Sequence, residues 1–191
     1  AYNSIGKVRL AQGELEEAET YFTEALRLAD RLADRRLMAQ SSGNLGELYL
    51  ARGEAEKALT ALQTAAASLD PKNPGEEGAI VYHNLGTVLK RLDRLEEALE
   101  QFKKALDINL KAKRFEEAAS NYYMIGSVYS RQGGYGQALE ALEQALRYDH
   151  LMENSLGIAK DLYALGVLHE KTGDPQAALE NTGRASRSIA V

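Results

Sequence analysis

The chain has no cysteine and no tryptophan, and its 191 residues include only three prolines, three phenylalanines and three histidines. Without cysteine, disulfides, thiolate nucleophiles and cysteine-based zinc sites are excluded. The scarcity of proline suits long helices, because proline breaks helix interiors. No stretch of about 18 apolar residues, the length that a membrane-spanning helix needs, occurs in the sequence. We therefore predict no membrane partner.

The composition is that of a soluble protein, with 45% hydrophobic and 27% charged residues and a formal net charge of −5. Proteins that grip nucleic acid normally carry a basic stripe, because they neutralise phosphates with Lys and Arg. The acidic balance therefore predicts no nucleic-acid partner. We expect a cytoplasmic protein.

A repeat of 40 residues runs through the whole chain. An apolar residue followed by Gly recurs at this interval, an Ala follows 12 residues after each Gly, and a second Ala follows 7 residues later. The Gly positions are Gly6, Gly46, Gly86, Gly126 and Gly166, and the Ala positions are Ala18, Ala58, Ala98, Ala138, Ala178 and Ala25, Ala65, Ala105, Ala145, Ala185. Such a period indicates stacked supersecondary units.

Each 40-residue repeat is predicted to form two antiparallel helices joined by a short turn. A turn residue lies seven positions after each Gly, as Gly13, Gly53, Asp93, Gly133 or Gly173. In the second repeat the first helix is expected over residues 35–52 and the second over residues 54–69. Gly within the first helix costs about 1 kcal/mol of helix propensity. Its recurrence predicts that it faces a small Ala of the second helix, so that the two backbones approach closely.

These residues resemble the tetratricopeptide repeat, most clearly in the stretches NLGELYLARGEAEKALTAL from Asn44, NLGTVLKRLDRLEEALEQFKKAL from Asn84 and MIGSVYSRQGGYGQALEALEQAL from Met124. The period of 40 residues is similar to the longer-helix variety of G-protein-signalling modulators and bacterial regulatory proteins. The resemblance implies a right-handed α-solenoid of five antiparallel helix pairs. We expect one domain over 1–191, with repeats at 1–34 (truncated), 35–74, 75–114, 115–154 and 155–191.

The sequence offers no catalytic constellation. The three histidines form no HExxH motif and have no metal-ligand spacing. The run Gly133-Gly134-Tyr135-Gly136 lacks the Lys-Ser/Thr of a phosphate-binding loop and coincides with an expected turn. We therefore predict that these residues are not an enzyme and bind no cofactor or metal.

The resemblance implies that a peptide or protein segment is held in a concave groove lined by the first helix of each pair. The protein would then be an interaction scaffold. Asn can pair with a peptide amide in either sense, and Tyr offers apolar area with a hydroxyl. The groove floor is basic in the third to fifth repeats, which predicts a partner with acidic groups. Its basic residues are Lys90, Arg91, Arg131, Lys160 and Lys171. The candidate groove residues are Asn44, Glu47, His83, Asn84, Thr87, Lys90, Arg91, Tyr123, Ser127, Arg131, Lys160 and Tyr163.

An alternative is self-assembly through the end faces of the array. The chain opens at Ala1 inside a truncated repeat, so we expect it to be the adaptor or sensor part of a longer protein. The open face of the first repeat is expected to expose Ile5 and Phe22. At the other end, Thr182 and Gly183 replace apolar residues, which is typical of a capping helix. Exposed apolar faces invite another chain to stack, giving a homo-oligomer.

Overall fold

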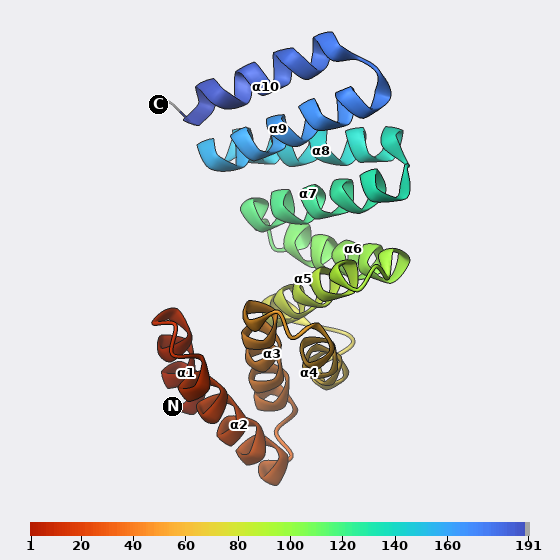
Figure 1. The fold of residues 1–191 in the computed structure, drawn as a ribbon. Helices are drawn as coiled ribbons and strands as arrows, with labels where there is room; N and C mark the ends of the chain where they lie inside the picture. The colour runs from red at the N-terminus through yellow and green to blue at the C-terminus, as the bar shows by residue number, and fades with distance from the viewer. Residues whose placement is uncertain (190–191) are drawn as a thin grey trace. The chain divides into compact units, whose positions relative to one another are not determined.

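The computed structural model describes residues 1–189, and this part of the chain forms ten α-helices without a strand (Figure 1). The prediction of an all-α fold of helix pairs is confirmed. The helices are α1 (Tyr2–Ala11), α2 (Leu15–Leu32), α3 (Arg35–Arg52), α4 (Ala55–Ser68), α5 (Gly75–Arg91), α6 (Leu95–Lys111), α7 (Phe115–Gln132), α8 (Tyr135–Leu151), α9 (Ser155–Thr172) and α10 (Pro175–Ile189).

The chain divides into two compact units, residues 1–101 and residues 102–191, with the division inside α6. Its organisation as one domain stays a prediction. In the first unit α1 contacts α3 and α3 contacts α5, and in the second unit α7 contacts α9. The first helices of successive pairs therefore lie next to one another within each unit, where their outward faces can form a shared surface.

At the repeated positions Gly6, Gly46, Gly126 and Gly166, the second helix of the pair leaves no room for a Cβ. A Cβ placed on Gly46 would lie 2.4 Å from Leu62 Cγ, and one on Gly6 would lie 2.4 Å from Phe22 Cε1. Real Cβ atoms do not approach this closely, so only Gly fits. The partner of Gly is thus mainly the large residue between the two Ala positions. The expectation that Gly faces Ala is corrected in this respect, although the Ala138 carbonyl does lie 3.2 Å from a Cβ on Gly126.

The expectation that Phe22 is exposed is wrong. Its side chain is fully buried, and it packs with Ala18, Leu45 and Leu48. The reason is that Phe22 occupies the large position that fills the space beside Gly6 of its own pair and the helix of the next pair. Ile5, in contrast, is 41% exposed, as expected.

The turns and helix starts follow from local chemistry. Gly53, at the end of α3, has φ 76°, and Asp93 has φ 62°, a left-handed conformation that Gly adopts without strain and Asp tolerates. At helix N-termini, the Asp34 side chain accepts a hydrogen bond from the Leu37 amide, and the Asn154 side chain accepts one from the Gly157 amide. These caps satisfy amides that have no partner within the helix.

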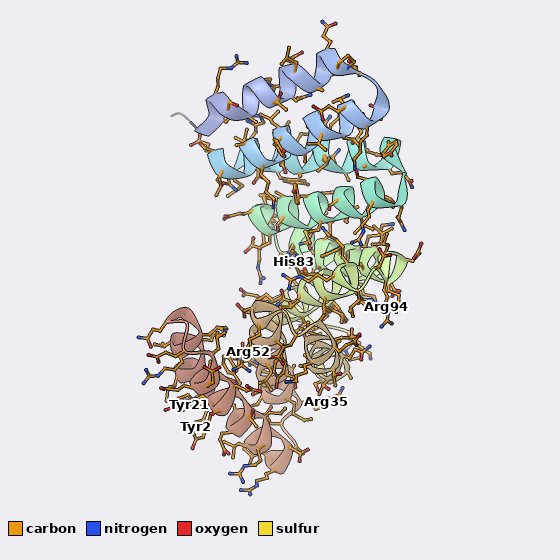
Figure 2. All side chains as sticks on the ribbon, viewed as in Figure 1. Tyr2, Tyr21, Arg35, Arg52, His83 and Arg94 are labelled. Atoms are coloured by element: carbon orange, nitrogen blue, oxygen red, sulfur yellow. The ribbon has the colours of Figure 1, made fainter. Side chains whose placement is uncertain are left out.

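Polar side chains also join helices of neighbouring pairs. The Tyr49 hydroxyl of α3 donates a 2.8 Å hydrogen bond to Glu19 Oε1 of α2, and Arg52 pairs with the other carboxylate oxygen. Burial and this hydrogen bond raise the pKa of Tyr49 to about 12, and the same bond, with Arg52, lowers the pKa of Glu19. Arg52 is labelled in Figure 2, as are Tyr2 of α1 and Tyr21 of α2. These two tyrosines belong to the helices of one pair, and their ring centroids are 6.4 Å apart.

Replacing Gly46 with Ala tests the close approach. The added Cβ must displace Leu62, which should lower the free energy of unfolding by about 1–3 kcal/mol. Gly43→Ala in the same helix is the matched control. There the added Cβ meets only Val81 Cγ2, at an ordinary 3.5 Å. That variant should gain about 0.5–1 kcal/mol from helix propensity. Urea unfolding followed by circular dichroism measures both, and equal effects of the two variants would contradict the packing argument.

Candidate functional site

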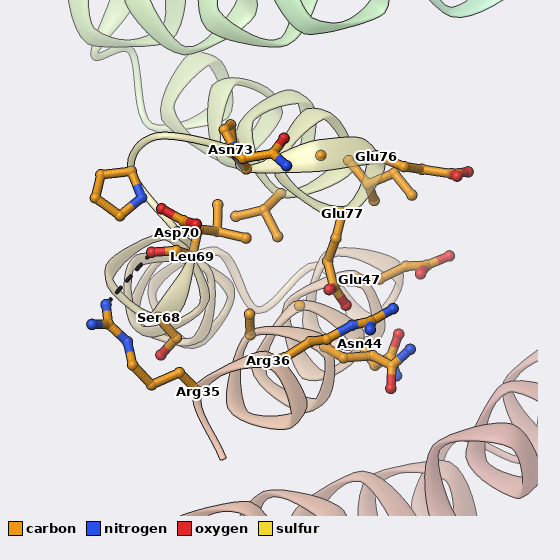
Figure 3. A pocket seen from close by; sticks show the side chains of 18 of the residues that line it. Arg35, Arg36, Asn44, Glu47, Ser68, Leu69, Asp70, Asn73, Glu76 and Glu77 are labelled. Carbon is orange, nitrogen blue, oxygen red and sulfur yellow. Dashed lines mark hydrogen bonds between the residues drawn. The ribbon is translucent and has the colours of Figure 1, made fainter. Parts of the chain in front are cut away.

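A pocket of about 1030 Å³ opens in the first unit, beside the predicted groove helix α3 (Figure 3). Its walls come from α1, α3, the end of α4, the connection 69–74 and the start of α5. Two of the twelve predicted groove residues, Asn44 and Glu47, line it. Apolar side chains that include Ala39, Leu69 and Val81 form part of the same lining.

The pocket exists because α4 is short. It has 14 residues where α2 has 18, and residues 69–74 connect α4 to α5, whereas residues 33–34 suffice between α2 and α3. Pro71 and Pro74 fall in this connection, and proline cannot continue a helix. Arg35 Nη2 donates to the carbonyl oxygens of Ala67 (3.0 Å) and Leu69 (3.5 Å), which compensates the open end of α4.

Asn44 is the most distinctive side chain of the pocket. It is only 6% exposed, and its Nδ2 has no hydrogen-bond partner among the described residues. Leaving a buried donor unpaired costs about 1–3 kcal/mol. A ligand carbonyl that reached Asn44 from the pocket would recover this cost.

Charges of both signs surround Asn44. Lys7, Arg35 and Arg36 are the cations of the lining, and Glu47, Asp70, Glu76 and Glu77 are its anions. Figure 3 shows the Glu77 side chain pointing from α5 toward the end of the pocket where Arg36 and Asn44 lie. Burial raises the pKa of Glu77, and the charges of Arg36 and Lys7 oppose that rise only in part.

Five of the predicted groove residues lie on α5 but outside this pocket. Thr87 donates to the His83 carbonyl oxygen at 3.0 Å, and Arg91 Nη1 donates to the Leu50 carbonyl oxygen at 2.9 Å. Arg91 therefore ties α5 to α3 in addition to presenting charge. The five residues are His83, Asn84, Thr87, Lys90 and Arg91.

The second unit brings together part of the remaining set. Lys160 Nζ of α9 lies 3.7 Å from the ring centroid of Tyr123 on α7, a cation–π contact. Tyr163, one turn further along α9, is 62% exposed. Ser127 and Arg131 lie on α7, and Lys171 Nζ of α9 donates to Ser130 Oγ at 3.3 Å. Tyr123 and Lys160 are thus adjacent, whereas Tyr163 offers an open ring.

Next to this contact lies a carboxyl pair that the sequence did not reveal. Asp161 is 1% exposed and Asp149 is 5% exposed. The pKa of Asp161 is raised to about 8, first by burial and then by the charge of Asp149 and the hydrogen bond to it, while Lys160 opposes the rise. Asp149 also accepts a 2.9 Å hydrogen bond from Asn154 Nδ2. The raised pKa favours the protonated form of Asp161, which can donate a hydrogen bond to Asp149.

Other pocket residues were also missed from the sequence, notably Arg36 and Glu77. The signal that could have found them is the Pro-containing segment 69–75, which departs from the otherwise regular connections. Within residues 1–189, no helix has the length and hydropathy needed to cross a membrane. No three His, Asp or Glu side chains in that range are grouped to hold a metal ion.

The family model of the tetratricopeptide repeat matches residues 1–70, 77–149 and 116–187. Together with the helix pairs, this match defines the class: a helical repeat protein of the kind that serves as an interaction scaffold. The chain belongs to the tetratricopeptide repeat family. No curated protein sequence matches it.

Solved structures share the fold at low sequence identity. BtubC (BKLC) from P. vanneervenii is 24% identical with a TM-score of 0.87, over 99% of this chain and 78% of that one. The apo form of RapI is 19% identical with a TM-score of 0.89, over 99% and 69%. YrrB, a TPR protein with an unusual peptide-binding site, is 21% identical with a TM-score of 0.71, over 98% and 84%.

The carboxyl pair predicts how stability depends on pH. The Asp161 pKa of about 8 lies above that of an unfolded Asp, about 3.9. The folded state therefore holds a proton that the unfolded state releases, so the free energy of unfolding should fall as pH rises between these values. Asp161→Asn should flatten this profile and stabilise the chain by about 1–3 kcal/mol at pH 8. Denaturant titrations from pH 5 to pH 9 measure it, and a variant whose pH profile matched the parent would refute the protonated pair.

Proposed function

We propose that the chain is a protein–protein interaction scaffold that holds a peptide or protein segment along the exposed faces of its first helices. The observation that carries this proposal is the unpaired, buried Nδ2 of Asn44 in a pocket of about 1030 Å³. Asn44 lines this pocket, and its unpaired Nδ2 can bond a main-chain carbonyl of a ligand once the side chain turns toward the pocket. The likeness to YrrB, a TPR protein with an unusual peptide-binding site, supports the same type of ligand.

The second unit would add a separate contact surface. The exposed ring of Tyr163 and the Tyr123–Lys160 pair provide apolar area with a positive charge, a combination that is common where proteins meet. Arg131 and Lys171 add further positive charge. We propose that this floor takes acidic groups of the partner. The scaffold would serve as the adaptor or sensor part of a longer protein.

Parallel affinity capture from native lysate tests the scaffold function. The baits are the parent chain, Asn44→Ala for the first unit, and Tyr123→Ala with Arg131→Ala for the second. Glu140→Ala with Glu143→Ala, two exposed positions of α8, is the control. We expect mass spectrometry to find proteins retained by the parent and the control but depleted at least threefold on a groove variant. Thermal melts confirm that each bait is folded. Identical captures on all baits would overturn the proposal.

A second candidate, self-assembly, is favoured by the repeat register of the end faces. Leu139 of α8 packs against the cluster that contains Leu165 and Leu168 of α9. Its equivalent 40 residues later is Leu179, which is 76% exposed on α10. The equivalents of Leu165 and Leu168 on α1 are Ile5 and Val8, which are 41% and 56% exposed.

The α10 face of one copy therefore carries the apolar residue that the α1 face of another copy can receive. A contact of this kind is head-to-tail, and it can extend from copy to copy. Sedimentation velocity at rising protein concentration tests it. We expect the mean mass to increase with concentration, and Val8→Glu or Leu179→Glu to restore the monomer mass. A monomer mass for the parent chain at every concentration would exclude this candidate.

A further inference from the structure

The pocket of the first unit contains three polar groups that have no partner. Asn44 Nδ2 is an unpaired donor, and the carboxylates of Glu47 and Glu77 make no hydrogen bond or ion pair within residues 1–189. Glu47 is exposed at the rim, whereas Glu77 is partly buried. The lining thus contains one unpaired donor, which a ligand can reach only when the Asn44 side chain turns toward the pocket, and two acceptors that carry charge.

The carboxylate of Glu77 is partly buried without a direct partner for its charge. Burial raises its pKa, which means that the charged form is poorly solvated. Arg36 and Lys7 are close enough to favour the charge, yet neither pairs with Glu77 directly among the described residues. A cation in direct contact with Glu77 would stabilise the charged carboxylate more than Arg36 and Lys7 do, because neither of them pairs with it.

The charge balance of the lining favours a cation over an anion as the ligand group. Four anionic and three cationic side chains line the pocket, which gives the lining a net negative charge. Among them, Arg35 donates to the carbonyl oxygens at the end of α4, and Asp70 accepts a hydrogen bond from the Lys72 amide. An incoming carboxylate would add a negative charge to a lining that already carries a net negative charge, and like charges at close range repel. A ligand that ends in a free carboxylate at this pocket is therefore disfavoured.

Taking these observations together, we propose that the first-unit pocket binds an internal, extended stretch of polypeptide that carries a Lys or Arg side chain. The Asn44 side chain turns toward the pocket and donates from Nδ2 to a main-chain carbonyl of this stretch, and Glu47 and Glu77 accept the basic side chain. Ile80, which lines the pocket and is 51% exposed, provides apolar contact for the aliphatic part of that side chain. The inference rests on the scaffold function proposed above and specifies which ligand the first unit selects.

This preference is opposite in sign to the one proposed for the second unit, whose floor carries Arg131, Lys160 and Lys171. The two surfaces would therefore select different segments. The difference gives the test a built-in contrast, because removing a negative charge from the first unit should leave the ligands of the second unit unaffected.

The probe is a library of random dodecapeptides displayed between constant flanks, so that no free C-terminus is present. The library is selected on the parent chain and on Asn44→Ala, Glu77→Gln and Glu143→Gln. The last variant removes an exposed charge from α8 and is the charge-matched control. We expect peptides with Lys or Arg to be enriched on the parent and the control, and to be lost on Asn44→Ala and Glu77→Gln.

One enriched peptide, acetylated and amidated, then enters a double-mutant cycle. Replacing its basic residue with Gln should weaken binding to the parent about three- to tenfold and have little effect on binding to Glu47→Gln with Glu77→Gln. Enrichment of acidic peptides, or no coupling in this cycle, would overturn the ligand class while leaving the scaffold function standing. No enrichment, or enrichment that survives Asn44→Ala, would instead overturn groove binding in the first unit. Thermal melts of each variant separate lost binding from lost folding.

Discussion

The approach of a Gly on one helix to a large side chain on the next is the contact on which the rest of the structure depends. At Gly46 the space that a Cβ would need is filled by Leu62, and at Gly6 it is filled by Phe22. Because the fit involves a missing side chain, it sets the distance between the two helices and also their rotation. The outward faces of α1 and α3 are then determined as a consequence, and with them the positions of Lys7 and Asn44.

The candidate site arises where this regularity is interrupted. Because α4 ends early, it does not cover the start of α3. Arg35 of α3 instead donates to a carbonyl oxygen at the end of α4. Asn44 and Glu77 lie on α3 and α5, two helices that contact each other. A site of this kind combines fixed polar groups with an open wall, which is the usual arrangement in ligand-binding pockets.

Much of the fold could be predicted from the sequence, because each repeat supplies the same evidence. The period placed the turn residues and the bounds of α3, and the caps at Asp34 and Asn154 follow from residue type. Phe22 is buried although it belongs to the first pair of the array, because its position between Ala18 and Ala25 faces the next pair. The groove prediction included Asn44 and Glu47 but not Arg36 or Glu77, whose approach depends on how far α4 extends.

The Asp149–Asp161 pair was missed because its residues lie on different helices and neither matches a motif. At the equivalent places in the first unit stand Leu69 and Val81, which pack together as ordinary apolar residues.

The connection 69–74 has one further consequence. A residue inserted into a helix turns everything beyond it by about 100° and moves apolar side chains off the buried face. An irregular connection has no such phase, so it can lengthen or shorten without disturbing the helices on either side. Since residues of this connection form one wall of the pocket, related proteins can alter what the pocket accepts through small insertions and deletions here. Ligand preference can then diverge between relatives whose helices superimpose.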